Sequence, residues 1–190
     1  MQLLIIDNYD SFTYNLVQVV RKITGHEPSV KRNDQFKMED LSSFDKILLS
    51  PGPGIPQEAG LLLPLIKTYG SSKSIMGVCL GQQAIVEAYG GSLKKMDQVY
   101  HGVATKINVT APDVIFKNLP SSFTVGRYHS WVAKKEIFPD VLQITSEDEH
   151  GNIMSVKHKS LDVRGVQFHP ESIMTEHGTQ IIANWIHHTS

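Results

Sequence analysis

A Gly-Val-Cys-Leu-Gly stretch at residues 77–81 most constrains this chain, and its Cys79 is the only cysteine in the sequence. The apolar run over residues 74–78 predicts a short buried strand, and apolar residues at helical spacing follow up to Gly90. A nucleophile between a strand and a helix, with a glycine on either side, is typical of a nucleophile elbow, a tight turn that lifts the side chain above the edge of a sheet. The N-terminus of the following helix favours a thiolate. The alternative is a small buried hydrophobe, which is common for a lone cysteine in an apolar segment.

Length and charge limit the class of protein. The 190 residues suffice for one domain with a sizeable core, and we predict a single domain over residues 1–190. The formal net charge of −1 indicates no basic surface that would attract nucleic acid or a membrane. One cysteine suits a reducing compartment. The first apolar run ends at Asp7 without a preceding basic region, so it predicts a strand and not a signal peptide. We therefore expect a cytoplasmic protein with no nucleic-acid or membrane partner.

Strand and helix patterns alternate along the first half of the chain. The expected strands are residues 3–6, 29–32, 46–49 and 74–78, and the expected helices are residues 12–23 and 61–69. This order predicts an α/β fold, in which helices cover both faces of a parallel sheet. The second half predicts shorter, partly antiparallel strands that extend this sheet, followed by a closing helix. These strands are residues 105–110, 141–145 and 153–157, and the helix is residues 178–187.

The carboxyl ends of parallel strands meet at one edge of a sheet, where binding sites gather. Asp7, the Pro-Gly-Pro-Gly loop at residues 51–54 and Cys79 all follow predicted strands. The loop is stiffened by its prolines, and its glycines let backbone N–H groups approach a ligand. Together with the amide of Leu80, such a loop provides an oxyanion hole for attack on a carbonyl. A stiff surface turn is the alternative interpretation.

A second candidate group of residues is Gln-Phe-His-Pro-Glu at residues 167–171. In an extended chain His169 and Glu171 point to the same side, with Cα atoms roughly 6.5–7 Å apart. A carboxylate beside an imidazole orients the ring and stabilises the imidazolium, as in a nucleophile–base–acid triad. Alone, such a segment is commonly a surface turn. His101 and His129 lie in loops where they can line a site. Since no residue spacing matches a metal cage, we expect no metal and no cofactor in this chain.

Four stretches together resemble the class I, or triad, glutamine amidotransferase domain, and the likeness spans nearly the whole chain. They are residues 50–54, 77–81, 128–130 and 167–171. The resemblance implies a flavodoxin-like, three-layer α/β fold with a mixed, mostly parallel sheet and a smaller antiparallel extension. It also implies that Cys79 is the nucleophile, His169 the base and acid, and Glu171 the carboxylate that orients His169.

The resemblance further implies a set of residues that bind glutamine and stabilise the oxyanion. These are Gly52, Pro53, Gly54, Leu80, Gln83, Ser130 and Trp131. Three positions depart from the pattern of the family. Gln82 stands where many relatives have His, Trp131 where Leu is frequent and Val103 where Lys is frequent. None of these replaces a triad residue.

A narrower likeness lies in residues 7–16, which look like the opening of the small subunits of anthranilate synthase and of aminodeoxychorismate synthase. Residues 50–58 and 164–178 favour the anthranilate synthase subunit. The likeness implies glutamine as substrate. It also implies, as partner, the large subunit of a chorismate-using synthase, in a heterodimer or heterotetramer, with magnesium only in that partner. The alternatives are the folate-pathway subunit, one subunit shared by both enzymes, a stand-alone γ-glutamyl cysteine hydrolase and a non-catalytic module.

Overall fold

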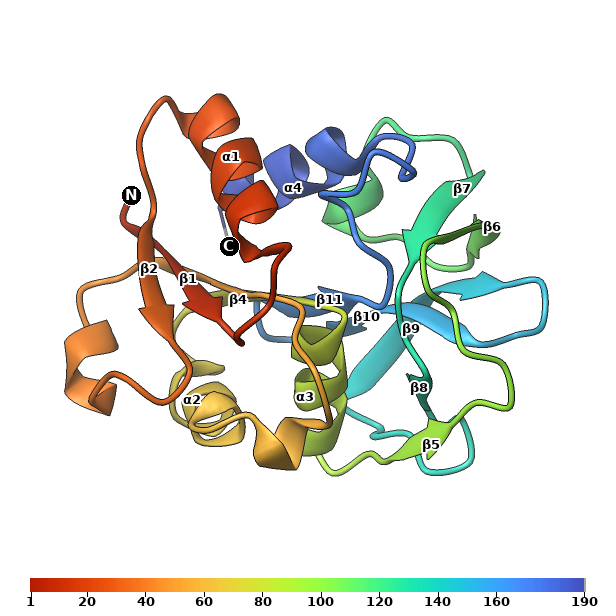
Figure 1. Cartoon of the computed structure of the whole chain (residues 1–190), viewed down its shortest axis with the longest axis horizontal. Coiled ribbons are helices and arrows are strands. Elements are labelled where there is room, and N and C mark those ends of the chain that lie inside the picture. Colours follow the sequence, from red (N-terminus) through yellow and green to blue (C-terminus); the bar gives the residue numbers. More distant parts are fainter. Residues whose placement is uncertain (190) are drawn as a thin grey trace.

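The computed structural model describes residues 1–189, in which a nine-stranded mixed sheet runs through the centre of the molecule (Figure 1). Its strands follow one another across the sheet in an order that differs from the order of the sequence. From one edge they are β2 (Ser29–Arg32), β1 (Leu3–Asp7), β3 (Lys46–Leu49), β4 (Ser74–Val78), β11 (Val163–Val166), β10 (Ile153–His158), β9 (Leu142–Asp148), β6 (Val103–Val109) and β7 (Ser122–Arg127). The predicted α/β fold is confirmed.

The sheet has two halves that join at β11. Strands β2, β1, β3, β4 and β11 pair in parallel, whereas β10, β9, β6 and β7 continue the sheet with antiparallel pairing. The antiparallel extension predicted from the sequence is therefore present. Strand β11 was not predicted, although it lies directly beside β4 and aligns Val166 with Val78. A separate two-stranded sheet pairs β5 (Leu93–Lys95) with β8 (Trp131–Ala133).

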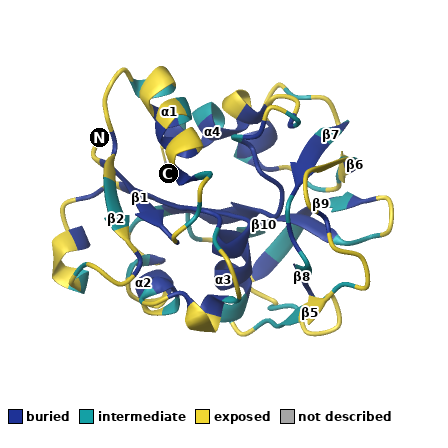
Figure 2. Ribbon diagram, in the orientation of Figure 1, coloured by how far each residue is buried: buried dark blue, intermediate teal, exposed yellow. Residues whose placement is uncertain are grey.

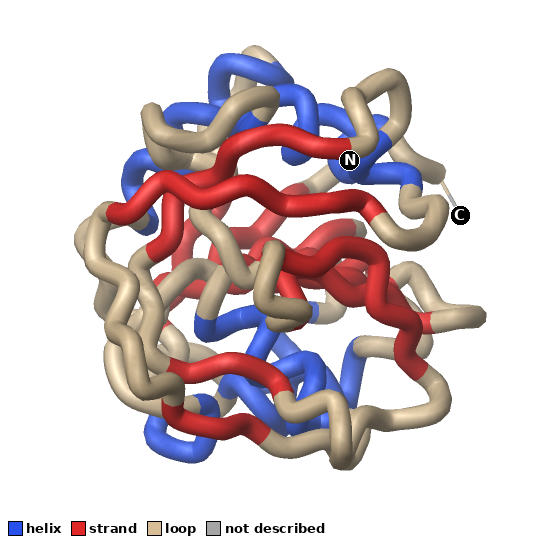
Figure 3. The backbone as a smooth tube through the Cα atoms, turned by 90° about the vertical axis from the view of Figure 1, so that its right-hand side faces the viewer, coloured by secondary structure: helices blue, strands red, loops and turns tan. Residues whose placement is uncertain are grey.

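Helices cover both faces of the parallel half. Helices α1 (Thr13–Thr24) and α4 (Gly178–His187) pack on one face, and α2 (Leu62–Tyr69) and α3 (Leu80–Ala88) pack on the other. Figure 3 shows the resulting three layers from the side, with strands between two layers of helix. Three short 3-10 helices lie in the connections, at Met38–Leu41, Pro56–Glu58 and Val114–Phe116. Within residues 1–189, no helix combines the length and the apolar character that crossing a membrane requires.

Strands β1, β3 and β11 are buried along their whole length, because helices shield both faces of the sheet, whereas the edge strand β2 is half-buried or exposed (Figure 2). Successive side chains of a strand point to opposite faces. Leu3 and Ile5 accordingly join the core beneath α1 and α4, whereas Leu4 and Ile6 join the core beneath α2 and α3. These two cores hold the strands in register, so that the loops after β1, β3 and β4 meet at one edge.

Lys46 ties the first residue of β3 to the end of α4. Its ammonium donates hydrogen bonds to the carbonyls of Trp185 at 3.1 Å and His188 at 2.9 Å, and to the hydroxyl of Ser74. Burial lowers the pKa of Lys46, and the negative charge of Asp162 opposes this shift. A cation at the C-terminal end of a helix satisfies carbonyls that have no partner within the helix.

We expect Lys46→Met to lower the free energy of unfolding by about 1–3 kcal/mol, because the buried carbonyls at the end of α4 lose their donor. Urea unfolding followed by circular dichroism measures the change. Lys94→Met, at an exposed position on β5, is the matched control and should leave stability unchanged. Equal stability of the two variants would contradict this role of Lys46.

Candidate active site

Cys79 lies at the junction of β4 and α3 with a backbone conformation that L-residues rarely adopt, φ 53° and ψ −102°. The turn is possible because the residues two positions before and after Cys79, Gly77 and Gly81, lack side chains. A Cβ atom on Gly77 would lie 2.3 Å from the carbonyl carbon of Gly81, and one on Gly81 would lie 2.7 Å from the carbonyl oxygen of Leu49. The amide of Cys79 donates to the carbonyl of Val166 at 2.8 Å. The predicted nucleophile elbow is thus present.

His169 and Glu171 form the second part of the site. The carboxylate Oε1 lies 2.7 Å from Nδ1 of His169, and both side chains are buried. The expectation of an extended segment was wrong, since the chain turns here and the amide of Ser172 donates to the carbonyl of His169. The turn leads the chain into α4, which begins so close to it that a Cβ on Gly178 would lie 1.9 Å from the carbonyl oxygen of Pro170.

The surroundings of His169 favour its protonated form. Burial by itself would lower the pKa of the imidazole, but the sulfur of Cys79 and the carboxylate of Glu171 both favour the protonated ring and raise the pKa to about 10. Because Nδ1 is engaged by Glu171, Nε2 is the ring nitrogen that remains to exchange a proton with the sulfur. The site therefore pairs an imidazolium with the thiol group of the elbow.

Two aromatic rings flank the imidazole. The ring centroid of Tyr128 lies 4.8 Å and that of Phe12 lies 5.3 Å from the centroid of His169. The helical pattern of the sequence placed Phe12 on the apolar face of the first helix. In the structure Phe12 is the residue before α1, and its ring contacts the candidate base. The two rings restrict the positions that the imidazole can adopt.

A cavity of about 230 Å³ opens over the sulfur of Cys79. Six of the predicted glutamine-binding residues line it, as do both loop histidines that the sequence singled out. The lining from the prediction comprises Gly52, Pro53, Gly54, Gln83, Ser130, Trp131, His101 and His129. Leu80 does not line the cavity, because it is buried and its side chain lies against Gly52.

The loop at residues 51–54 is held against the elbow and the first strand. A Cβ on Gly52 would lie 2.6 Å from side-chain atoms of both Asn8 and Leu80, so only glycine fits there. The side chain of Asn8 in turn donates to the carbonyl of Ser50. Asp7, whose role the sequence left open, accepts hydrogen bonds at Oδ1 from the amides of Tyr9 and Asp10 and from Thr13 Oγ1, which fixes the turn before α1.

The wall opposite this loop, residues 127–131, rests on a buried charged pair that the sequence analysis did not find. Arg127 Nη1 lies 2.8 Å from Asp148 Oδ2, and both side chains are 1% exposed. Arg127 Nε also donates to Nε2 of His129 at 3.0 Å. Burial and the positive charge of Arg127 lower the pKa of His129 to about 3, so His129 is neutral and its Nδ1 donates to the carbonyl of Trp131. Arg127 and Asp148 are distant in sequence and carry no local motif.

The three departures from the family pattern lie in different surroundings. Gln82 is fully buried in α3, Trp131 lines the cavity, and Val103 begins β6 with 37% of its surface exposed.

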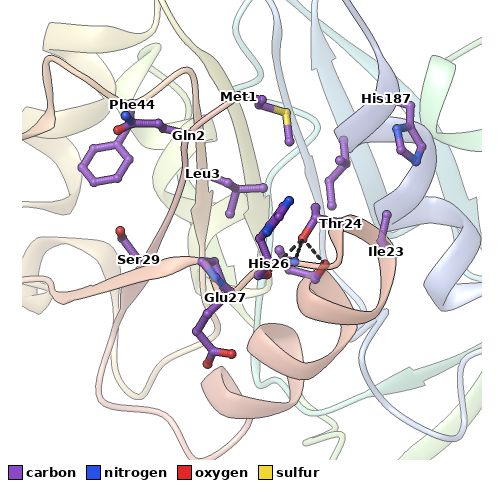
Figure 4. A pocket seen from close by; sticks show the side chains of 13 residues that line it. Met1, Gln2, Leu3, Ile23, Thr24, His26, Glu27, Ser29, Phe44 and His187 are labelled. Atoms are coloured by element: carbon purple, nitrogen blue, oxygen red, sulfur yellow. Dashed lines mark hydrogen bonds between the residues drawn. The ribbon is translucent and has the colours of Figure 1, made fainter.

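A larger cavity, of about 560 Å³, lies at the amino ends of β1 and β2, the opposite edge of the sheet from Cys79. Figure 4 shows Met1, Leu3, Ile23 and His187 around it. Its lining includes none of the predicted site residues. Within residues 1–189, no cluster of three or more His, Cys, Asp or Glu side chains is arranged to hold a metal ion.

The fold and the cavity over Cys79 define a class of protein that comparison with known sequences identifies. The model of the class-I glutamine amidotransferase family matches residues 4–189, and the chain belongs to this family.

Named relatives lie within the same family. The chain is 44% identical to anthranilate synthase component 2 of Pseudomonas aeruginosa, an alignment covering 97% of this chain and 94% of that protein. It is 42% identical to aminodeoxychorismate synthase component 2 of Escherichia coli, over 97% of this chain and 99% of that protein. It is 41% identical to the aminodeoxychorismate/anthranilate synthase component 2 of Bacillus subtilis, over 97% of this chain and 95% of that protein. Among solved structures, a Thermoplasma acidophilum protein assigned to GMP synthase superimposes with a TM-score of 0.87 at 27% identity, covering 98% of this chain and 92% of that one.

We expect the imidazolium of His169 to persist to about pH 10 in the isolated chain, and its titration midpoint to fall in Cys79→Ala and in Glu171→Gln, because each change removes a group that favours the cation. NMR of histidine-labelled protein measures the midpoint, and the signal lost in His169→Asn assigns it. Since this pKa lies above the roughly 6.5 of an unfolded histidine, the protonated ring stabilises the fold below about pH 6.5, an effect lost as pH rises through about 10.

The matched control for this titration is Glu149→Gln, which neutralises an exposed carboxylate 3.6 Å from His150. It should leave the midpoint of His169 unchanged. An unchanged midpoint in Cys79→Ala would show that the sulfur does not face the imidazole.

Proposed function

We propose that this chain acts as a single domain that hydrolyses glutamine through Cys79, His169 and Glu171 and delivers ammonia to the large subunit of a chorismate-using synthase, with anthranilate synthase as the first candidate. The observation that carries the proposal is the position of His169, whose Nδ1 lies 2.7 Å from Glu171 while its cationic ring faces the only thiol, at the floor of a cavity. This arrangement matches nucleophilic acyl transfer.

In the first step the thiolate of Cys79 attacks the side-chain amide carbon of glutamine. The carbonyl π electrons move to oxygen, and the oxyanion is met by the amide of Leu80 and by an amide of the loop at residues 51–54. The C–N bond then breaks as the imidazolium of His169 gives its proton to the leaving nitrogen, which departs as ammonia. The product on the protein is a γ-glutamyl thioester of Cys79, and His169 is left neutral.

In the second step the neutral imidazole takes a proton from water, and the resulting hydroxide adds to the thioester carbon. The tetrahedral intermediate collapses, the C–S bond breaks, and the thiolate returns beside the reprotonated His169 as glutamate leaves. Glu171 keeps the ring in one tautomer during both steps and stabilises the imidazolium. Each step is complete with side chains of this chain and water, so the hydrolysis requires no metal of its own, and we assign magnesium to the partner.

Glutamine recognition is assigned to the two walls of the cavity. Ser130 and Trp131 present main-chain groups to the amino-acid end of the substrate, and Gly52, Pro53 and Gly54 form the opposite wall. Gln83 contributes through its side-chain oxygen, because its nitrogen already donates to the carbonyl of Trp131 at 3.0 Å and to Gln167 at 3.2 Å.

The names of the relatives support a partner subunit, since each is component 2 of a synthase. Ammonia in bulk water is protonated and ceases to be a nucleophile, which is a chemical reason to release it directly into a bound partner. We place the reaction in the cytoplasm, where reducing conditions maintain the thiol. The second candidate is the aminodeoxychorismate synthase subunit, which the Escherichia coli relative favours, and a subunit shared by both enzymes is the form that the Bacillus subtilis relative favours.

We expect Cys79→Ser to abolish glutamine-dependent product formation by the reconstituted complex while leaving ammonia-dependent formation unchanged, because only the source of nitrogen is lost. Product release in the presence of either nitrogen source measures this directly. Ser92→Ala, a change of similar size outside the cavity, should leave both rates unchanged. Glutamine-dependent synthesis by Cys79→Ser would rule out Cys79 as the nucleophile.

The partner is identified by combining the chain with each candidate synthase subunit, chorismate, glutamine and magnesium, and by determining which amine forms. Anthranilate alone supports the first candidate, aminodeoxychorismate alone supports the second, and both products indicate a shared subunit. Glutamate release without either amine, and with no stimulation by a partner, would instead indicate a stand-alone γ-glutamyl hydrolase. Absence of glutamate release in every combination would indicate a non-catalytic module.

A further inference from the structure

A buried glutamine, Gln167, contacts the sulfur of Cys79. Cys79 follows β4, whereas Gln167 follows the neighbouring strand β11. Gln167 is 0% exposed, and its backbone amide donates to the carbonyl of Met154. Its side-chain Nε2 lies 3.6 Å from Cys79 Sγ. This separation suits an N–H···S hydrogen bond, because sulfur is larger than oxygen. The mechanism derived above gives Gln167 no part.

The orientation of this amide follows from one carbonyl. The oxygen of Trp131 can only accept, so the atom of Gln83 that lies 3.0 Å from it must be the donor Nε2. The second hydrogen of that nitrogen needs an acceptor, and the atom 3.2 Å away on Gln167 must therefore be Oε1. The other end of the Gln167 amide, which faces the sulfur, is then the N–H donor.

The same carbonyl is fixed from its other side. Nδ1 of His129 donates to it at 2.9 Å, and the proton must be on Nδ1 because Nε2 accepts from Arg127, which carries only donors. Arg127 is held in turn by Asp148 at 2.8 Å. A connected series of hydrogen bonds thus runs from a buried ion pair to the nucleophile, and within it the carbonyl of Trp131 accepts from both His129 and Gln83. Every link is buried or partly buried, where hydrogen bonds hold their geometry well.

We infer that Gln167 is a further catalytic residue, whose side-chain amide stabilises the thiolate of Cys79 and is kept in the donating orientation by Gln83. The inference rests on the proposed function in that it takes Cys79 as the nucleophile. A donor to an anionic acceptor forms a stronger hydrogen bond than a donor to a neutral one. The bond is therefore strongest when sulfur is a thiolate and weaker in the thioester.

This role differs from that of His169. His169 must give up its proton to the leaving ammonia, so it cannot remain a positive charge beside the sulfur throughout the reaction. The amide of Gln167 does not titrate and donates in every state. It consequently stabilises the sulfur both as the attacking thiolate and as the thiolate that departs when water cleaves the thioester. Gln167 provides constant stabilisation, and His169 provides the mobile proton.

The test uses the intact chain and the rate at which iodoacetamide alkylates its one cysteine, measured as a function of pH. Alkylation reads the thiolate directly, and no other cysteine contributes. In Gln167→Met, which lacks the donor, we expect the midpoint of the pH–rate profile to rise by about one pH unit, equivalent to about tenfold slower alkylation on the rising part of the profile. The plateau at high pH should match that of the unchanged chain.

Two further variants separate a lost hydrogen bond from a disturbed core. Gln167→Glu keeps the shape and the acceptor for Gln83 but sets an acidic group in place of the N–H donor, and should raise the midpoint further. Gln83→Met leaves Gln167 in place but removes the donor that orients its amide. This variant should raise the midpoint of the alkylation profile less than Gln167→Met does. The matched control is Gln82→Met, because Gln82 is also a fully buried glutamine, and its amide makes no hydrogen bond to any described residue.

An unchanged midpoint in folded Gln167→Met or Gln167→Glu would overturn the inference, and so would an equal rise in Gln82→Met. Near-ultraviolet circular dichroism establishes that each variant is folded. Failure of the proposed function looks different, because alkylation requires neither glutamine nor a partner. A chain that releases no glutamate but shows the expected shifts in midpoint would retain the Gln167–Cys79 contact and lose the proposed reaction.

Discussion

The backbone of Cys79 is the constraint on which the rest of the site depends. Its positive φ is sustained by close approaches that only Gly77 and Gly81 allow and by the hydrogen bond to Val166. That hydrogen bond continues the pairing of β4 with β11 past the end of the strands. Because β11 runs parallel to β4, the chain leaving it reaches the same edge of the sheet, and His169 arrives beside the sulfur as a direct result of strand pairing.

The sequence was informative where the determinants are local. The elbow, the loop at residues 51–54 and the His169–Glu171 pair each lie within a few residues, and turn chemistry and spacing reveal them. Helix α4 and its buried Ile181, Ile182 and Trp185 followed from helical periodicity. The prediction failed for β11, since four residues containing Arg and Gly carry no periodic signal and become a strand only by insertion between β4 and β10. It failed for Phe12 because α1 begins one residue later than the apolar pattern suggests.

The parts of the site that were not predicted are polar groups whose partners are distant in sequence. Arg127 and Asp148 meet through the antiparallel half, and Gln167 meets Gln83 across β11 and α3. A buried ion pair does not by itself stabilise a fold, because desolvation of the two charges offsets their attraction. What this pair does is to set the direction of donors and acceptors around His129 and Trp131. Arg127 Nη2 is buried without a hydrogen-bond partner among the described residues, so it is the bonds of Nη1 and Nε that fix this geometry.

The cavity is built from both sides of β11, the strand at which the parallel and antiparallel halves of the sheet join. Cys79, the loop at residues 51–54 and the candidate base His169 belong to the parallel half or to the turn that leaves it, whereas the wall at residues 127–131 lies at the end of β7 and in the connection to β8. The wall and the elbow are nevertheless linked, because the hydrogen bonds that begin at Arg127 and Asp148 reach Cys79 through Trp131, Gln83 and Gln167. The shape of the cavity therefore depends on one half of the chain and the position of the sulfur on the other, and a few side-chain amides transmit any change in one to the other.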